Sequence, residues 1–304
     1  MNFVFFDTEC ANCLGGEGKI CSFGYVITDM QFNVIKKKDI LINPDAKFLL
    51  GNAKTGKGIS LAYPLFKFRD SKKFPFFYAE IKKILEDKNN IIFGFSVDQD
   101  IRYLIYTCKR YALKELFYNA FDIQLFDKCI CQEQNTHGLD FLIKKYNLKS
   151  LTYHRSDDDA YMSMEIFKKL CEELNLNPCD AVKKYSNCFI DNKKVAKDFE
   201  ERKKKIIEKQ LIEKMFDEFL APMTINDITN YDEFFVNKKI VFERKLFNEN
   251  KDEMMLLKEK IYKKGGMIVK KFEDANYIII KYNSRYELKE NQKFILYKNF
   301  VKRF

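Results

Sequence analysis

The stretch Asn2-Phe3-Val4-Phe5-Phe6-Asp7-Thr8-Glu9 decides the fold of this chain. Its short aromatic run is rich in strand-forming residues and predicts a buried β-strand. Side chains two positions apart in a strand share a face, so Asp7 and Glu9 would project together from its end. Two adjacent carboxylates repel each other unless a cation lies between them, and hard cations such as Mg²⁺ prefer oxygen ligands. The alternative is that Asp7 only caps a turn, since an Asp-x-Glu spacing also occurs by chance.

The composition bounds the size and class of the protein. A chain of 304 residues exceeds one typical domain, so we expect two domains of about 100 to 200 residues each. The hydrophobic share of 46% and the 30 Phe residues are enough to build packed cores. The net charge of +10 favours a polyanionic partner, with a membrane surface as the rival.

The cysteines and the lack of membrane signals indicate a reducing compartment. No apolar run reaches about 18 residues and no leader precedes the first strand, so we expect no membrane segment and no signal peptide. Nine cysteines, an odd number, favour a cytoplasmic protein without disulfides. Cys10 and Cys13 form a Cys-x-x-Cys, but Cys129 and Cys131 lack the spacing of a second zinc knuckle. We therefore interpret these cysteines as reduced, structural thiols.

Hydrophobic periodicity predicts an α/β domain over residues 1–175. We expect further strands at 19–28, 32–42, 91–95 and 121–126, and helices at 77–86, 101–108, 139–146 and 157–171. Residues 54–75 form a polar, loop-like excursion. An antiparallel meander followed by alternating strands and helices is typical of a mixed sheet, whose sites gather at the strand ends.

A charged linker and a second small domain follow. Residues 176–235 are rich in Lys and Glu and predict an exposed linking helix at 193–219. Its Arg202-Lys203-Lys204-Lys205 run could contact phosphates, but we favour a solvated helix face. Residues 236–304 restart an α/β pattern, with strands at 239–242, 267–269, 277–280 and 294–297 and a helix at 251–262 that Gly265-Gly266 ends.

Two further carboxylates and a histidine complete a candidate site. Asp100 follows a short buried strand and leads into a helix, and Asp159 lies in the first turn of the 157–171 helix. His154 precedes Asp159 by five residues. Four carboxylates and one imidazole are what a two-metal phosphodiesterase needs, namely oxygen ligands for two cations and a base for the attacking water.

Three segments carry a family resemblance. Residues 6–9 (Phe-Asp-Thr-Glu), 94–104 (Gly-Phe-Ser-Val-Asp-Gln-Asp-Ile-Arg-Tyr-Leu) and 154–160 (His-Arg-Ser-Asp-Asp-Asp-Ala) resemble, in order, the exonuclease motifs of the DnaQ-like (DEDD) superfamily. The resemblance spans roughly residues 2–170 and is closest to DNA polymerase III epsilon-type domains. The His-to-Asp spacing of five is that of the histidine (DEDDh) subgroup, whereas Arg155 stands where the tyrosine subgroup has Tyr.

The resemblance implies a fold and a role for each site residue. It implies a ribonuclease H-like mixed sheet in which Asp7, Glu9, Asp100 and Asp159 hold two Mg²⁺ or Mn²⁺ ions. His154 would be the general base. The second motif departs from the family, because Phe95-Ser96 stands where Gly is usually followed by His-Asn.

The second and third motifs each contain more than one aspartate, so the metal ligand must be chosen among them. We prefer Asp100 to Asp98 as the ligand, because Asp100 leads directly into the apolar helix face and Asp98 is typical of an N-cap. Asp157 and Asp158 are explained by the preference for negative charge at a helix N-terminus. His137, the other histidine, precedes a helix, and we interpret it as structural.

The C-terminal segment resembles a BRCT domain. The strand at 239–242, the helix ending at Gly265-Gly266 and the 274–280 segment match its layout, with Phe300 at the position of its usual Trp. Glu243-Arg244 replaces the Ser/Thr-Gly of phosphopeptide readers, so docking of a DNA end or of a protein is the better expectation.

These inferences combine into one expected function. We expect a metal-dependent 3′-5′ exonuclease that releases nucleoside monophosphates from single-stranded or frayed DNA ends in replication or repair. The BRCT-like domain would bind DNA or a replication or repair protein. An exoribonuclease is the first alternative, because the same site serves both sugars. A non-catalytic nucleic-acid scaffold is the second.

Overall fold

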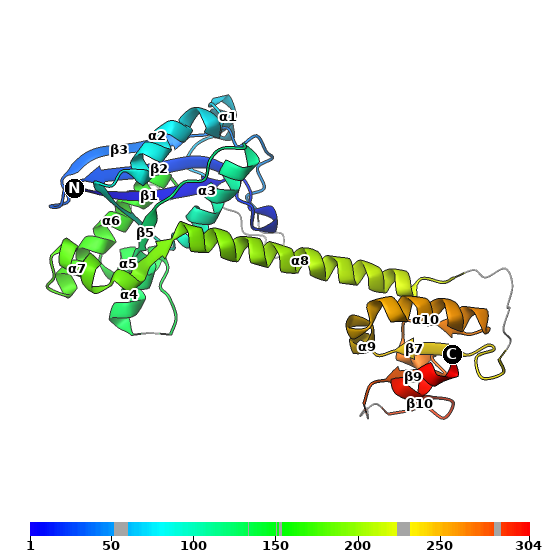
Figure 1. Cartoon of the computed structure of the whole chain (residues 1–304). Helices are drawn as coiled ribbons and strands as arrows, with labels where there is room; N and C mark the ends of the chain where they lie inside the picture. The colour runs from blue at the N-terminus through cyan, green and yellow to red at the C-terminus, as the bar shows by residue number, and fades with distance from the viewer. Residues whose placement is uncertain (52–59, 133, 150, 152–153, 224–231, 283–286) are drawn as a thin grey trace. The chain divides into compact units, whose positions relative to one another are not determined.

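The computed structural model describes residues 1–51, 60–132, 134–149, 151, 154–223, 232–282 and 287–304. The chain divides into two compact units, Met1–Glu201 and Arg202–Phe304 (Figure 1). Part of the predicted 54–75 excursion lies outside the described residues. Among the helices in the ranges given above, none has the length and apolar character needed to cross a bilayer.

The first unit is built on a six-stranded mixed sheet. Its strands are β1 (Asn2–Cys10), β2 (Ile20–Thr28), β3 (Val34–Leu41), β4 (Asn90–Gly94), β5 (Asn119–Asp122) and β6 (Phe189–Asp191), in the order β3-β2-β1-β4-β5-β6. The first three strands pair antiparallel, and β1, β4 and β5 pair parallel. The predicted meander and the mixed α/β class are therefore confirmed.

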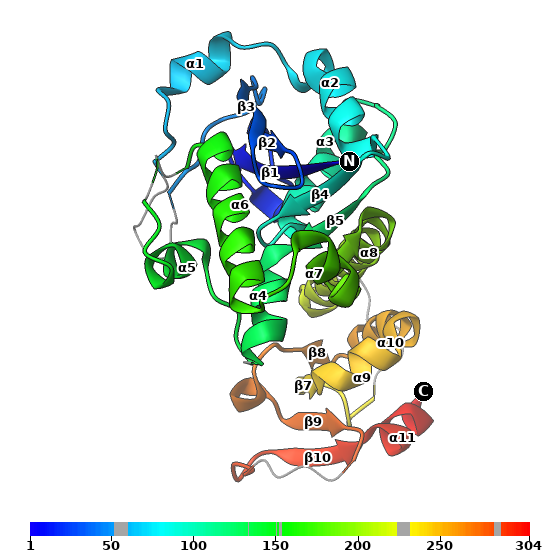
Figure 2. The same cartoon turned by 90° about the vertical axis from the view of Figure 1, so that its left-hand side faces the viewer.

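Helices cover both faces of this sheet. They are α1 (Leu65–Asp70), α2 (Phe74–Glu86), α3 (Asp98–Arg110), α4 (Ile123–Cys131), α5 (Leu139–Lys145), α6 (Ser156–Glu173) and α7 (Pro178–Lys184), with 3-10 turns at Leu14–Gly16 and Ser186–Cys188. Because side chains alternate along β1, Val4 and Phe6 pack in one core with α2 and α3. Phe3 and Phe5 pack in the other with α6, which lies on the opposite side of the sheet (Figure 2).

The structure corrects three details of the first unit. Residues 121–126 are not one strand, because β5 ends at Asp122 and α4 begins at Ile123. The Asp122 carboxylate accepts the Leu125 N–H at 3.1 Å and so caps this helix. The loop-like excursion contains the short helix α1. Asp98 is the first residue of α3 and not its N-cap, a position that Val97 occupies without a side-chain bond.

Residues 178–191, placed in the linker by composition, have structure of their own. They form α7, a 3-10 turn and β6. β6 pairs antiparallel with β5 at Phe121 and Phe189, so it extends the main sheet.

The second unit contains a smaller, parallel sheet. Its order is β10-β9-β7-β8, formed by β7 (Lys239–Phe242), β8 (Met267–Ile268), β9 (Tyr277–Ile280) and β10 (Lys293–Leu296). Its helices are α9 (Arg244–Glu249), α10 (Lys251–Lys263) and α11 (Tyr297–Phe300), with 3-10 turns at Phe272–Asp274 and Val301–Arg303. The predicted linking helix is α8 (Asn192–Leu220), which contains the boundary between the units. Phe219, Phe247 and Phe300 are fully buried in the core of this unit.

Candidate active site

Three of the predicted carboxylates converge at one end of β1. One oxygen each from Asp7, Glu9 and Asp159 lies within 4.8 Å of the others. Asp7 and Glu9 share a face of β1, as the strand period predicts, and Asp159 comes from the first turn of α6. The structure thus brings together residues that are about 150 positions apart in the sequence.

The first turn of α6 is fixed against β2 beside this cluster. Ser156 donates its hydroxyl to the Ser22 hydroxyl at 2.8 Å, and Ser22 pairs with Glu9 across the β1–β2 ladder. Two residues along the same strand, Gly24 leaves space for the backbone of α6. Ser22, Gly24 and Ser156 were not predicted as site residues, although a glycine inside a strand is a signal of close backbone approach.

Asp100 approaches the strand end from the other face of the sheet. Its side chain is buried in the first turn of α3, and its Oδ1 accepts two hydrogen bonds from Thr8, one from the backbone N–H at 3.0 Å and one from the hydroxyl at 2.5 Å. Thr8 lies between Asp7 and Glu9 and points to the opposite face. Asp98, in contrast, is 47% exposed and forms an ion pair with Arg102 at 3.1 Å. The geometry therefore distinguishes the two aspartates of the second motif.

His154 lies beside Glu9. The distance from its Nδ1 to Glu9 Oε1 is 3.4 Å, and its side chain is 43% exposed. The backbone at His154 has a left-handed φ of +58°, which turns the chain just before α6. Its carbonyl accepts the N–H of Ala62 at 3.3 Å, so the segment that begins at Ser60 is joined to the histidine. The contact with Glu9 raises the pKa of His154.

Burial and neighbouring negative charges raise the pKa values of three aspartates of the site. Burial, followed by the charges of Asp100, Glu9 and Asp159, raises the pKa of Asp7 well above its ordinary value. Burial is also the main reason why the pKa values of Asp100 and Asp159 rise to about 7. Buried carboxylates of this kind are ionised together only when positive charge compensates them. The oxygen donors and the repulsion among the buried carboxylates both fit a hard divalent cation.

Asp157 and Asp158 form ion pairs with cationic side chains. Both side chains are buried, and both form ion pairs with Lys37. The distance from Lys37 Nζ to Asp157 Oδ2 is 3.7 Å. Arg155 Nε lies 2.8 Å from Asp157 Oδ1. Their position at the start of a helix was predicted, but these cations also hold them in place.

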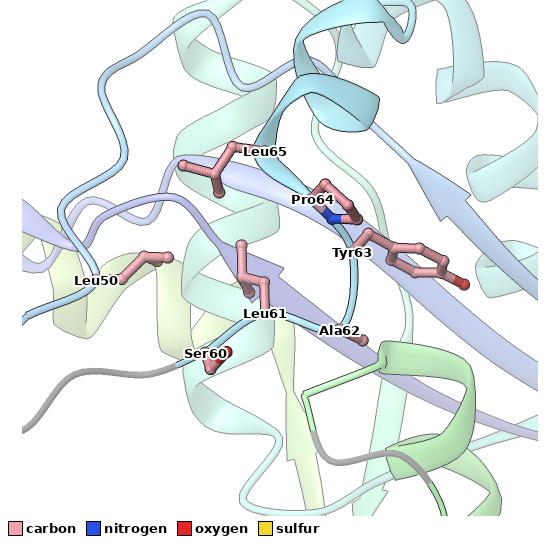
Figure 3. A pocket seen from close by; sticks show the side chains of 7 residues that line it. All are labelled: Leu50, Ser60, Leu61, Ala62, Tyr63, Pro64 and Leu65. Atoms are coloured by element: carbon pink, nitrogen blue, oxygen red, sulfur yellow. The ribbon is translucent and has the colours of Figure 1, made fainter.

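A pocket opens next to the His154 segment. It has a volume of about 660 Å³ and is lined, among the described residues, by Leu50 and by residues 60–65 (Ser-Leu-Ala-Tyr-Pro-Leu) (Figure 3). The Ala62 N–H that bonds to His154 comes from this wall. The wall is mostly apolar, with a hydroxyl from Ser60, whereas the Tyr63 hydroxyl is hydrogen-bonded to Asp39.

The two thiols that follow Glu9 differ in character. A hydrogen bond between the Cys10 and Cys13 side chains lowers the pKa of Cys13 to about 6 and raises that of Cys10. All nine cysteines are free, in agreement with the reduced thiols predicted.

Comparison with known proteins supports an exonuclease-type first unit. A sequence profile of the exonuclease family (RNase_T) matches residues 64–167, a range that contains Asp100, His154 and Asp159 and begins after Asp7 and Glu9. No curated protein matches the sequence.

Several solved structures resemble the chain at low identity. The Mg²⁺- and Mn²⁺-bound form of S. pombe Pop2p has 14% identity over 56% of this chain and 82% of its own, with a TM-score of 0.44. The nuclease domain of 3′hExo, a DEDDh family member bound to rAMP, has 12% identity over 57% and 91%, with a TM-score of 0.45. E. coli exonuclease I in complex with a dA16 oligonucleotide has 15% identity over 56% of this chain and 41% of its own, with a TM-score of 0.45.

Proposed function

We propose that the first unit is a two-metal-dependent 3′-5′ exonuclease that releases nucleoside monophosphates from the 3′ ends of DNA. The observation that carries the proposal is the convergence of Asp7, Glu9 and Asp159 oxygens within 4.8 Å, with His154 at 3.4 Å from Glu9. The exonuclease family match over residues 64–167 supports the same reaction class. We place the activity in DNA replication or repair.

The carboxylates would hold the cations. Asp7, Glu9 and Asp159 offer oxygens to one Mg²⁺ or Mn²⁺, and Asp100, whose charge acts on Asp7 from the other face, would help to hold a second. When bound, two such ions activate a water molecule and stabilise the charge that develops on the phosphoryl group. Thr8 would keep the Asp100 carboxylate in position through its two hydrogen bonds.

His154 would accept the proton of the attacking water. A general base must be within hydrogen-bond reach of that water and must be neutral at the working pH. In the structure the imidazole faces Glu9, which raises its pKa. Once Glu9 serves as a metal ligand, it accepts less strongly from the imidazole, so the pKa of His154 falls back towards a range suited to a base.

The pocket beside His154 would receive the terminal nucleotide. Its wall from Ser60 to Leu65 offers apolar and aromatic surface, and bases stack on such surfaces without regard to sequence. DNA and RNA ends would both fit this chemistry. We favour DNA because of the second unit.

The second unit would be a BRCT-like docking domain. The parallel order β10-β9-β7-β8 and the buried Phe300 support this assignment. Arg244 lies 3.7 Å from the centre of the Phe216 ring and pairs with Glu213 at 2.9 Å. Because Arg244 is engaged within the unit, docking of a DNA end or of a replication or repair protein is favoured over phosphoserine binding.

The test is a nuclease assay on 5′-labelled single-stranded DNA and matched RNA, with Mg²⁺ or Mn²⁺ and with EDTA. A ladder of progressively shorter labelled products that requires metal and is lost in Asp7→Asn would support the proposal. Labelled mononucleotide as the first product would indicate degradation from the 5′ end and contradict the proposed 3′-5′ polarity. Faster degradation of RNA would favour an exoribonuclease, and no degradation of either would favour a non-catalytic scaffold.

A further inference from the structure

A second cluster of metal-binding side chains lies on α4. Asp127 and Cys131 are four residues apart on this helix and therefore share a face, and His137 follows in the connection to α5. One ligand atom from each of the three lies within 4.8 Å of the others. None of these residues belongs to the proposed active site.

The distances in the cluster are close to those of a tetrahedral ion site. Asp127 Oδ1 lies 3.6 Å from Cys131 Sγ, and Asp127 Oδ2 lies 2.7 Å from His137 Nδ1. Zinc bonds of about 2.0 Å to oxygen or nitrogen and about 2.3 Å to sulfur place neighbouring ligands about 3.3 to 3.6 Å apart. The first separation already agrees, and the second would widen by about 0.6 Å as the metal replaces a proton.

The environment holds the ligands in place. The Asp127 side chain is fully buried. The backbone carbonyl of His137 accepts a hydrogen bond from Gln124 Nε2 at 2.8 Å. The imidazole ring of His137 stacks on the Phe141 ring, with a centroid distance of 4.4 Å and an interplanar angle of 13°. An imidazole oriented in this way loses little freedom when it binds an ion.

We propose that Asp127, Cys131 and His137 form a zinc site that is chemically distinct from the carboxylate cluster at Asp7. A thiolate and an imidazole favour Zn²⁺, whereas an all-oxygen cluster favours Mg²⁺ or Mn²⁺. Three protein ligands leave one tetrahedral position for water. Binding removes the Cys131 thiol proton and the proton between His137 and Asp127, because zinc ligands are deprotonated.

The zinc site would stabilise α4, which packs against α6, the helix that carries Asp159. Phe126, which precedes Asp127, packs on Phe167 of α6 with ring centroids 5.6 Å apart. An ion bound by Asp127 and Cys131 of α4 and by His137 would hold the start of α5 against α4. The expected role is therefore structural.

The test uses the full chain, freed of metal and then titrated with Co²⁺ in excess Mg²⁺. Cobalt bound to a thiolate gives a near-ultraviolet charge-transfer band, and tetrahedral Co²⁺ gives intense visible bands. We expect one Co²⁺ per chain with both signals and displacement by Zn²⁺. Cys131→Ser should lose the charge-transfer band, and His137→Asn should weaken binding by at least about tenfold, as loss of even an outer partner costs about 10- to 100-fold.

Cys129→Ser is the matched control, because Cys129 is exposed on the same helix. It should keep both signals. Thermal unfolding gives the second measurement, since Zn²⁺ should raise the Tm of the native chain and of Cys129→Ser but not that of Cys131→Ser or His137→Asn. A native chain without the band contains an Asp127–His137 ion pair only, and a band that survives in Cys131→Ser belongs to another cysteine. Either result overturns the proposal.

Discussion

Asp7 and Gly24 lie directly opposite each other in the β1–β2 register. A Cβ atom at Gly24 would lie 2.0 Å from the backbone carbon of Ser156 and 2.1 Å from the backbone nitrogen of Asp157. Such distances are far below van der Waals contact, so only glycine admits the first turn of α6 at this place. Asp159 follows in the same turn, and the absent side chain is therefore what lets its carboxylate reach Asp7.

Gly24→Ala should consequently impair the site more than the fold. The added methyl group must displace the start of α6, which we expect to cost about 1 to 3 kcal/mol of unfolding free energy. A displacement of about 1 Å at a catalytic group costs about 100-fold in rate, so nuclease activity should fall by a similar factor. Urea unfolding and initial rates measure the two effects. Gly51→Ala is the control, because nothing lies within 4 Å of a Cβ there.

Equal activity of Gly24→Ala and the native chain would show that Asp159 does not depend on this close approach. A lower unfolding free energy with an unchanged initial rate would mean that the contact between Gly24 and α6 is merely structural.

His154→Asn should remove the proposed general base and preserve the fold. The residue has a φ of +58°, and Asn is among the residues that adopt this left-handed conformation most readily. We expect the rate to fall by about 100- to 10,000-fold, the usual contribution of a general base. Metal affinity, followed by Mn²⁺ titration, should change little. Added imidazole should restore part of the rate, and a native rate in the variant would remove His154 from the mechanism.

Asp100→Asn and Asp98→Asn separate the two aspartates of the second motif. Asp100 is buried and accepts both hydrogen bonds from Thr8, so its replacement should lower the rate by at least about 100-fold. Asp98 is 47% exposed and its carboxylate pairs with Arg102, so its loss should change the rate less than about twofold. Rates at saturating Mg²⁺ give the comparison. The opposite ranking would shift the motif by two residues.

Local patterns predicted the parts of this fold that depend on local sequence. The alternation along β1 placed Asp7 and Glu9 on one face, and the apolar faces of α3 and α6 placed Asp100 and Asp159 in first helical turns. That these elements meet was inferred from the tendency of sites to gather at strand ends and from the family resemblance. A strand and a helix about 150 residues apart have no local signal that they touch.

The features that were not predicted also depend on contacts between distant parts of the sequence. Whether Thr8 bonds to Asp100 and whether Gly24 admits α6 depends on the register between strands and on helix placement, which the sequence does not state locally. The three-residue strand β6 is too short to show a period. From Phe121 to Leu125 apolar and polar residues alternate with the period of a strand, and only the Asp122 cap marks the change from β5 to α4.

Asp159→Asn should stabilise the metal-free protein at neutral pH. Burial, and then the charge of Glu9, raises the pKa of Asp159 to about 7 from an ordinary value of 3.8. Between these values the folded chain binds a proton that the unfolded chain has lost, so stability falls as the pH rises through this window. Asn cannot ionise and avoids the penalty. The Tm of the variant in EDTA should exceed that of the native chain by several degrees near pH 7, since about 1 kcal/mol corresponds to about 2 to 4 °C in a chain of this size.

The advantage of Asp159→Asn should disappear as the pH falls below 3.8, where the native carboxyl group becomes protonated in the unfolded as well as in the folded state. Mg²⁺ should raise the Tm of the native chain more than that of the variant, because the carboxylate is a proposed ligand for the ion. Asp158→Asn is the contrasting control. That residue forms an ion pair with Lys37, so its replacement should lower the Tm at pH 7 and leave the response to Mg²⁺ intact. A lower Tm for Asp159→Asn in EDTA at pH 7 would mean that Asp159 is stabilised in the absence of metal, and it would contradict the origin we assign to the metal requirement.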